Sequence, residues 1–533
     1  MAAVALLFLG MTVWLQWLAG SYSSELSGYP DEPAHYVTSL MVRDYIVSGF
    51  PAHPIRYAEN YYLHYPKVAF GMWGPLFPCF VGIWLLASAT RASVMLCMAA
   101  ITAALATTVC RVVWKQYSIE AGLVAGAALV ASPFIQSSTS MVMGDNFCAL
   151  LDFWACLWFA RYLDTGRARH SILFGLFASL SILAKPSGVA LALLPLLAVA
   201  MVRRFALLRT RAFWYPAVIV LVIAGPWQVL EFRLLAGMQR EMNPGWAITL
   251  LGYAVRMLGA WIFPLVILGV IVRLVRPLQK VHFSSVWVSA GALAIAVWAY
   301  HFLLPVGSAE PRYMNPVLAP MLMFLMVGVH SVARRLPPAG MSVRIKAAAV
   351  MGVAALVFAT QTFAIPRKPF TGFGEAAEAL LVRPDLKDAV FLVSSEADGE
   401  GQFVSEVAMR ERRPGHIVLR ASKMLGQSDW RRQRYKLLHS APEELMEYLD
   451  SIPVRAVIVQ RSPSWGRLDH HQLLLETLKD YSSRFRLIGT FPARPRPPSN
   501  SRIEAYEVLG QEGRPPGKIR IEMPYTWGKT IER

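Results

Sequence analysis

Long apolar runs separated by short polar loops set the pattern of the first two thirds of the chain. Early runs occupy residues 2–19, about 70–88, 92–113 and 120–136, and later ones 146–162, 171–184, 188–202, 213–228, 257–275, 284–304, 314–333 and 346–365. Such runs approach the ~20 residues that an α-helix needs to cross a bilayer. Because backbone groups in lipid must be hydrogen-bonded within the segment, the runs predict membrane-spanning helices.

Two polar stretches limit how many of these runs cross the membrane. Asp31 follows the first run and Asp145 follows the fourth. If both lie on the outer side, an even number of crossings separates them, whereas three runs lie between them. We therefore expect one of the two middle runs, 92–113 or 120–136, to be a partial helix. We predict 11 spans, with 12 or 13 as alternatives.

The basic residues predict an orientation for the bundle. Of the 25 Lys and Arg residues before residue 366, 14 lie in four short loops, which alternate with loops that carry few cations. Cytoplasmic loops of membrane proteins are enriched in Lys and Arg. This alternation explains the formal charge of +18 better than nucleic-acid binding does, and no nucleic-acid partner is expected. It places residues 20–70 as a large outer loop of a multi-pass protein of the cell inner membrane.

The pattern changes near residue 366, where a Pro-Arg-Lys-Pro stretch ends the last apolar run. Apolar runs of strand length follow at 389–393, 454–459, 486–491 and 503–508. Helical patterns lie at 442–450 and 472–481, and Pro442 suits a first helical position. We therefore predict a membrane domain over 1–365 and a soluble α/β domain over 366–533. By topology the soluble domain lies on the extracytoplasmic side.

Composition supports a membrane protein and argues against a cysteine metal site and against a disulfide framework. The mean hydropathy is +0.41, and 55% of the residues are hydrophobic. The five cysteines lie in or beside apolar runs, without the spacing of a metal site or a disulfide framework. We expect them to be small buried hydrophobic residues.

Two adjacent carboxylates, Asp31 and Glu32, follow the first apolar run. Ionisable groups beside a membrane helix are costly, and this favours a functional role. The alternative is that Asp31 caps a helix, with Pro33 close behind it, and one carboxylate could do both. Residues 35–48 have an amphipathic pattern typical of an interfacial helix.

Other polar residues fall on the predicted outer face. Asp145 precedes one run, Lys185 ends another, and Arg312 and Tyr313 follow Glu310 in a loop. Each has a structural alternative: Asp145 could cap its helix, Lys185 could extend towards the headgroups, and Arg312 could pair with Glu310.

The aromatic stretch 61–67 also lies on the outer side and contains His64, Tyr65 and Lys67. Aromatic residues at this density are typical of a membrane interface, and that explains most of them. Lys67 is not explained in this way, because its ammonium group suits a phosphate at the headgroup level. His64 and Tyr65 are additional candidates for substrate binding.

The order of these residues resembles that of the GT-C glycosyltransferases. The order seen in that family is matched, over roughly residues 20–330, by Asp31-Glu32, Asp145, Ala184-Lys185-Pro186 and Arg312-Tyr313. Within that family the chain resembles the bacterial relatives of the protein O-mannosyltransferases and the lipid A aminoarabinose transferases. The resemblance implies an all-α GT-C membrane bundle, a polyprenyl-phosphate sugar donor, and Asp31 as the catalytic carboxylate. One departure is Trp73-Gly74-Pro75, which stands where the family often has Lys-Pro-Pro, and it weakens the assignment of Lys67 to the donor phosphate.

The chemistry of sugar transfer assigns a role to each candidate. A carboxylate must accept the proton of the attacking hydroxyl or amine, which suits Asp31. Glu32 and Asp145 could orient the acceptor, raise the pKa of Asp31 or bind a divalent metal, so a metal cofactor stays open. Arg312 can hold a departing phosphate with two hydrogen bonds, and Lys67 and Lys185 are further candidates.

The sequence therefore predicts a membrane glycosyltransferase of the cell envelope. It would transfer a hexosyl or pentosyl group from a lipid-linked donor to a glycan, lipid or protein acceptor. A transporter or flippase of a lipid-linked substrate is the alternative, and a non-catalytic scaffold is a third. Transporters often have paired halves and polar residues at the midplane. Here Asp152 is the main charge within a run, no matching halves are evident, and a hydrogen-bonded structural role suits Asp152 better than proton relay.

Overall fold

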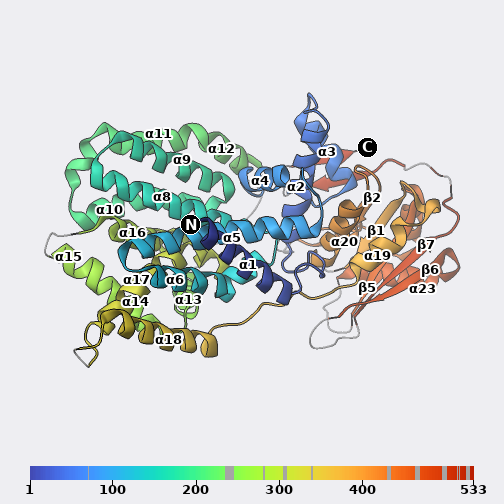
Figure 1. Cartoon of the computed structure of the whole chain (residues 1–533). Helices are drawn as coiled ribbons and strands as arrows, with labels where there is room; N and C mark the ends of the chain where they lie inside the picture. Colours follow the sequence, from blue (N-terminus) through green and yellow to red (C-terminus); the bar gives the residue numbers. More distant parts are fainter. Residues whose placement is uncertain are drawn as a thin grey trace.

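The computed structural model contains a bundle of apolar helices with an α/β region at one end (Figure 1). It describes residues 1–69, 71–234, 245–279, 283–303, 309–337, 340–395, 397–428, 434–462, 468–494, 501–512, 514, 517–523 and 528–532. Phe70 and residue 304, at the ends of two predicted spans, lie outside these ranges.

The bundle is built from consecutive helices that follow the predicted apolar runs. Its first half contains α1 (Ala2–Leu18), α5 (Arg91–Gln116), α6 (Ile119–Ala131), α7 (Pro133–Thr139), α8 (Asp145–Thr165), α9 (Ala168–Ala184), η1 (Pro186–Ala192) and α10 (Leu194–Val202). Its second half contains η2 (Phe205–Arg209), α11 (Arg211–Ile223), α12 (Gly225–Leu234), α13 (Gly245–Arg256), α14 (Phe263–Val270), the π-helix η3 (Ile271–Val275), α15 (Arg276–Gln279), α16 (Ser285–Leu303), η4 (Pro311–Met314), α17 (Asn315–Ala333) and α18 (Val343–Gln361).

Length and composition identify several of these helices as membrane spans. Among the described residues, α5, α16, η4 with α17, and α18 are long and apolar enough to cross a membrane. Two bent pairs raise the number from four to six if each is one span: α6 with α7, bent by 61°, and α11 with α12, bent by 47°. Shorter apolar helices lie at Ala2–Leu18, Ala168–Ala184, Pro186–Val202 and Phe263–Val275. The total of 11 spans stays a prediction.

The predicted second span does not form. The segment between α1 and α5 contains α2 (Glu32–Val47), α3 (Pro54–His64) and α4 (Leu76–Trp84). With 9 residues, α4 is roughly 14 Å long at 1.5 Å per residue, which is far short of the bilayer core. Gly74 lies just before α4, and a Cβ there would lie 2.0 Å from the carbonyl oxygen of Leu183, so only glycine fits this close approach.

The short helix α4 bears on the number of crossings between Asp31 and Asp145. If the bent pair α6–α7 is one span, two crossings separate Asp31 from Asp145, and this agrees with the position of both residues at one end of the bundle. The prediction that 92–113 or 120–136 is the partial helix stays a prediction, while the short helix that the structure shows lies in the run 70–88. This run is incomplete because Gly71, Gly74 and Pro75 interrupt it before a full span can form.

The C-terminal region forms a small α/β unit around a five-stranded sheet in the order β2-β1-β5-β7-β6. The strands are β1 (Val390–Ser394), β2 (Ile417–Arg420), β5 (Val454–Arg461), β6 (Phe485–Pro492) and β7 (Arg502–Val508), with two small pairs, β3 (Gly426–Gln427) with β4 (Lys436–Leu437) and β8 (Arg520–Met523) with β9 (Lys529–Glu532). Strand β1 pairs in parallel with β2 and β5, and β7 pairs antiparallel with β5 and β6. The four predicted strands are confirmed.

The helices of this region are α19 (Phe373–Leu381), α20 (Ala397–Arg410), α21 (Ala421–Met424), α22 (Pro442–Ser451) and α23 (Asp469–Asp480), with 3-10 turns η5 (Pro384–Leu386) and η6 (Ser482–Arg484). The two predicted helices correspond to α22 and α23, and Pro442 begins α22 as predicted. All five residues of β1 are buried, so the core lies between the sheet and its covering helices.

Buried polar contacts attach the C-terminal region to the outer loop. Helix α2 packs against α20, and α3 packs against β2, as Figure 1 shows. Arg91 at the start of α5 pairs with Glu406 of α20 at 2.6 Å, and Arg413 pairs with Asp44 of α2 at 2.7 Å. Helix α2, predicted to lie at the membrane interface, therefore has much of its surface buried in protein.

Candidate active site

Asp31 stands at the start of α2 with its side chain unused by the helix. It occupies the N-cap position, but it makes no side-chain cap hydrogen bond. The capping alternative is therefore not observed. Its carboxylate is a third exposed, and Oδ2 lies 3.5 Å from Nη2 of Arg312, which is long for a hydrogen bond. The Asp31 carboxylate thus lies near the Arg312 guanidinium without a short hydrogen bond to it.

Arg312 lies in η4, the short turn that leads into α17, and three groups fix its position. Its Nε is 2.9 Å from Oε2 of Glu310, so the pairing considered as a structural alternative is present. The guanidinium carbon lies 4.1 Å from the centre of the Tyr29 ring, within cation–π range. The Tyr29 hydroxyl donates a hydrogen bond of 2.5 Å to Glu310 Oε1, which joins the outer loop to η4.

Asp145 and Lys185 form a second ion pair at the same end of the bundle. Asp145 is the first residue of α8, and Lys185 follows the last residue of α9. The Asp145 side chain is only 2% exposed, and its Oδ2 is buried without a hydrogen-bond partner among the described residues. It does not cap α8, whose N-cap is Gly144. Arg312 lies alongside, with Nη1 3.8 Å from the sulfur of Met143.

Aromatic rings form one wall beside these charges. The Lys185 ammonium lies 5.0 Å from the centre of the Tyr313 ring, and Tyr313 stacks on His301 with centres 5.1 Å apart. His35 of α2 stacks on Trp73 at 3.9 Å. Trp73 belongs to the stretch that departs from the family pattern, and its packing on His35 places that stretch beside the charged cluster.

The site combines charge with burial, and this shifts the pKa of several of its groups. Burial raises the pKa of Asp31, and the positive charges of Arg312 and then Lys67 oppose that rise. Burial lowers the pKa of Lys67 to about 8, and the positive charge of Arg420 adds to the effect. A carboxylate with a raised pKa is a better base near neutral pH than an ordinary surface carboxylate.

His35 begins the stretch 35–48, which was predicted to be an interfacial helix, and it is not among the predicted site residues. Burial lowers the pKa of His35 to about 3, and the charges of Asp145, Lys185 and Arg312 all act on the ring. It is therefore a neutral imidazole within the charged cluster. Tyr29 was missed as well, because nothing in the local sequence indicates that its ring lies under Arg312.

The structure thus brings together Asp31, Asp145, Lys185, Arg312 and Tyr313, with Lys67 close enough for its charge to act on Asp31. These residues come from the segment between α1 and α5 and from one end of α8, α9 and α17. They are far apart in the sequence. Their proximity agrees with an even number of crossings between Asp31 and Asp145, which follows if α4 does not cross the membrane.

Three other candidates have partners elsewhere. Glu32 is fully buried and pairs with Lys368 at 2.7 Å, while the backbone N–H groups of Gly28 and Val142 donate to its two oxygens. Tyr65 donates a 2.5 Å hydrogen bond to Glu411. His64 contacts the carbonyl oxygens of residues 415 and 416. The structure therefore places all three in contacts with the chain beyond residue 365, and their predicted parts in catalysis and substrate binding stay predictions.

Metal-ligating side chains do not gather at this site. Among the described residues, no group of three or more His, Cys, Asp or Glu side chains is arranged to hold a metal ion. Asp152, deeper in α8, accepts a 2.5 Å hydrogen bond from Ser181, in agreement with the structural role expected for it.

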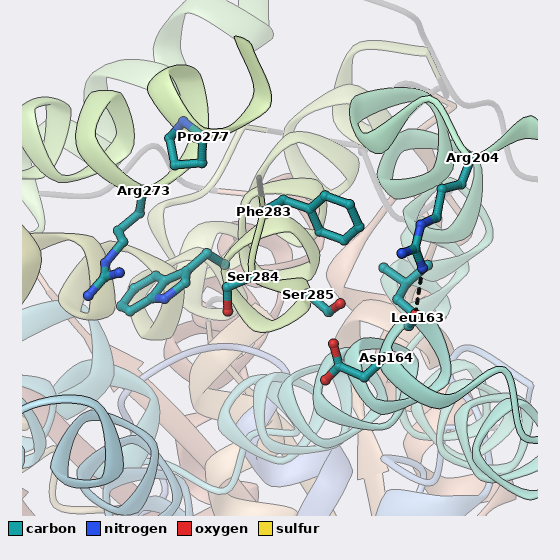
Figure 2. Close-up of a pocket in the computed structure, with 9 residues that line it drawn as sticks. Leu163, Asp164, Arg204, Arg273, Pro277, Phe283, Ser284 and Ser285 are labelled. Atoms are coloured by element: carbon teal, nitrogen blue, oxygen red, sulfur yellow. Dashed lines mark hydrogen bonds between the residues drawn. The ribbon is translucent and has the colours of Figure 1, made fainter. Parts of the chain in front are cut away.

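A separate cavity of about 520 Å³ lies at the opposite ends of the helices (Figure 2). Its lining includes Asp164 near the end of α8, Arg204 after α10, Arg273 in η3 and Ser285 at the start of α16. Because α8 has 21 residues, its two ends are roughly 30 Å apart. None of the predicted site residues lines this cavity.

Comparison with solved structures gives the fold a name. ArnT from Cupriavidus metallidurans in the apo state superposes with a TM-score of 0.58 at 14% identity, covering 97% of this chain and 100% of ArnT. The same protein bound to undecaprenyl phosphate gives 0.58 at 14% identity, with 96% and 99% covered. The oligosaccharyltransferase AglB from Archaeoglobus fulgidus, in complex with an inhibitory peptide and a dolichol-phosphate, gives 0.51 at 13% identity, with 86% and 69% covered.

The chain has the GT-C glycosyltransferase fold. The predicted resemblance is confirmed at the level of fold, and the match to ArnT includes the C-terminal region. The sequence itself matches no protein-family model and no curated protein. At these identities the GT-C likeness does not carry over any residue's role.

Proposed function

We propose that this protein is an integral membrane glycosyltransferase that moves a sugar from a polyprenyl-phosphate donor to an extracytoplasmic acceptor. The observation that carries the proposal is Asp31, a helix-start carboxylate that caps nothing and stands 3.5 Å from the guanidinium of Arg312. The GT-C fold, and the lipid phosphates bound to ArnT and AglB, support a donor of this class.

Asp31 serves as the general base. The acceptor hydroxyl or amine loses its proton to the Asp31 carboxylate while its oxygen or nitrogen forms a bond to the anomeric carbon of the sugar. The bond from that carbon to the phosphate oxygen breaks, and the polyprenyl phosphate leaves with one more negative charge. Burial raises the pKa of Asp31, so the proton it receives is held more firmly than by an ordinary aspartate.

Arg312 and Lys185 serve the departing phosphate. The planar guanidinium can donate two parallel hydrogen bonds to phosphate oxygens, and this contact strengthens as charge develops. Arg312 already stands between Asp31 and Glu310 at 3.5 and 2.9 Å. A bound phosphate would draw Arg312 away from Asp31 and leave that carboxylate free to accept a proton.

The remaining charged candidates position this pair. The buried contacts of Glu32 with Lys368 and with the chain near Val142 hold the start of α2, and so hold Asp31. Asp145 keeps Lys185 at the site, where its ammonium also faces Tyr313.

In this proposal the reaction takes place on the outer side of the cell inner membrane, where the lipid tail of the donor stays in the bilayer. The predicted domains, 1–365 and 366–533, then have separate tasks. The bundle holds the donor, and the soluble extracytoplasmic part closes the site from the aqueous side. The transferred group is a hexosyl or pentosyl unit, and the acceptor is a glycan, a lipid or a protein of the envelope.

The test is turnover by the full-length protein in nanodiscs. Undecaprenyl-phosphate sugar with a radiolabelled sugar is incubated with a cell-envelope extract, and lipid carrier and products are separated. The proposal predicts that label leaves the carrier and appears in a second product in proportion to enzyme. Label that stays on the carrier would contradict the proposal and favour a transporter or flippase of the lipid-linked substrate, or a non-catalytic scaffold.

A further inference from the structure

A group of basic side chains lies at the edge of the C-terminal sheet formed by the carboxyl ends of its parallel strands. Strands β1 and β2 are parallel, so their carboxyl ends, at Ser394 and Arg420, meet at one edge. In open sheets with parallel strands this edge is where ligands bind. The edge faces the outer loop, because Nη1 of Arg420 lies 3.5 Å from the carbonyl oxygen of Pro66.

Three cations gather here: Lys67 from the outer loop, Arg420 at the end of β2 and Lys423 in α21. The buried Glu400 of α20 compensates Arg420, with Nε 3.0 Å from Oε2. Ser422 donates both its backbone N–H and its hydroxyl to Glu400, so the hydrogen bonds given for this carboxylate go to Arg420 and Ser422 and not to the two lysines.

Lys67 and Lys423 are partly buried and have no ion-pair partner among the described residues. Lys67 follows Pro66, whose carbonyl oxygen lies 3.5 Å from Arg420, and Lys423 lies in α21, which begins directly after Arg420, so the three cations belong to one cluster. The charges of Arg420 and Glu400 accordingly act on both ammonium groups. Asp31 and Asp398 also act on Lys67. Burial lowers the pKa of each lysine to about 8, which indicates that an anion at this point would be favourable.

The backbone of α20 is shaped to admit Lys67. A Cβ at Gly401 would lie 2.6 Å from Cε and 3.1 Å from Nζ of Lys67, so the lysine side chain lies directly on this glycine. Glycine weakens a helix, and its presence here allows the close approach that a side chain would prevent. The position of Lys67 is therefore set jointly by the outer loop and by α20.

We propose that Lys67, Arg420 and Lys423 hold an anionic group, a phosphate or a carboxylate, of the acceptor. This inference rests on the proposed function and names the chemistry of its second substrate. Because Lys67 is near both Asp31 and Arg420, an acceptor anchored here would present its nucleophile towards Asp31. The phosphate of the donor has a separate place at Arg312, since its lipid tail keeps it at the headgroup level.

The test measures binding of two phosphate compounds to the full-length protein in detergent by isothermal titration. Glucose 1-phosphate represents a soluble phosphate, and undecaprenyl phosphate represents the lipid carrier. We expect Lys423→Gln to weaken glucose 1-phosphate by about tenfold, as loss of one charge-assisted contact would. We expect it to leave the Kd of undecaprenyl phosphate unchanged. Lys423→Arg should retain both affinities, and the exposed Lys479→Gln serves as the matched control.

Three outcomes would overturn the inference: absence of glucose 1-phosphate binding to the wild type, equal weakening of both ligands by Lys423→Gln, or weakening of glucose 1-phosphate by Arg312→Gln but not by Lys423→Gln. The last two would assign the phosphate to the donor site. Asp31→Asn separates this inference from the proposed function. It should abolish transfer and leave glucose 1-phosphate binding intact, whereas retained transfer would remove Asp31 as the base without touching the anion site.

Discussion

The carboxylates at the end of the bundle beside α2 differ in how closely their partners approach them. Glu32 is buried against Lys368, Asp145 is paired with Lys185, and Glu310 is bonded to Tyr29 and Arg312. Asp31 alone among these four has its nearest charged partner at 3.5 Å and a third of its side chain exposed. It is the carboxylate that can exchange its partner for a substrate at little cost.

The pH dependence of transfer tests the environment of Asp31. Lys67 lowers the pKa of Asp31, so Lys67→Gln should raise that pKa and move the acid limb of kcat/KM to higher pH. Lys67→Arg keeps the positive charge and should leave the acid limb in place. The measurement is kcat/KM for transfer between pH 4 and 8. An acid limb that Lys67→Gln does not move would show that Asp31 is not the group titrating there.

At the scale of the elements, the hydrophobic periodicity predicted most helices and strands. The elements that it missed or misjudged have local causes. The run 70–88 is apolar enough for a span, but Gly71, Gly74 and Pro75 shorten it to α4. Strand β2 was missed because its 4 residues are too few for a pattern. Helix α20 was missed because Gly399 and Gly401 lower its helical propensity, and the close approach of Lys67 to Gly401 depends on tertiary packing.

Packing between α14 and α17 depends on two glycines that the apolar pattern does not single out. A Cβ at Gly328 would lie 2.0 Å from the carbonyl oxygen of Leu265, and one at Gly269 would lie 1.9 Å from that of Phe324. Small residues at such positions let membrane helices approach closely.

Gly328→Ala should therefore destabilise the bundle by about 1–3 kcal/mol, the usual range for overpacking. The measurement is thermal unfolding in detergent by intrinsic fluorescence. Gly352→Ala in α18 is the matched control, since a Cβ there meets nothing within 4 Å. Its stability should stay equal or rise by up to about 1 kcal/mol. Equal unfolding temperatures for Gly328→Ala and wild type would contradict the close helix contact.

For the whole molecule, the C-terminal region completes the candidate site. Lys368 holds Glu32, Gly401 admits Lys67, and Glu25 of the outer loop accepts the N–H groups of residues 371, 372 and 374 at the start of α19. The sequence predicted that this region lies on the same side as Asp31. It did not reveal these contacts, because each joins residues more than 300 positions apart.

We expect the contact between the C-terminal region and the bundle to affect sugar transfer, although it lies away from Asp31. Glu406 is fully buried between Arg91 and Arg410, which are 15% and 28% exposed, so Glu406→Gln leaves two partly buried arginines poorly compensated, at a cost of up to about 3 kcal/mol. Hydrogen exchange in α20 should become faster, and transfer should fall with Asp31 intact. Glu59→Gln, which breaks a more exposed pair with Lys529, should change little. Unchanged exchange in α20 for Glu406→Gln would contradict this docking.

The most direct measurement compares Asp31→Asn with wild type for both sugar transfer and donor binding. Asparagine keeps the size of the side chain and removes its ability to take a proton, so transfer should fall by at least about 100-fold. The Kd for undecaprenyl phosphate should stay near that of wild type, and the exposed Glu378→Gln should leave both values unchanged. Transfer at the wild-type rate by a folded Asp31→Asn protein would contradict the account.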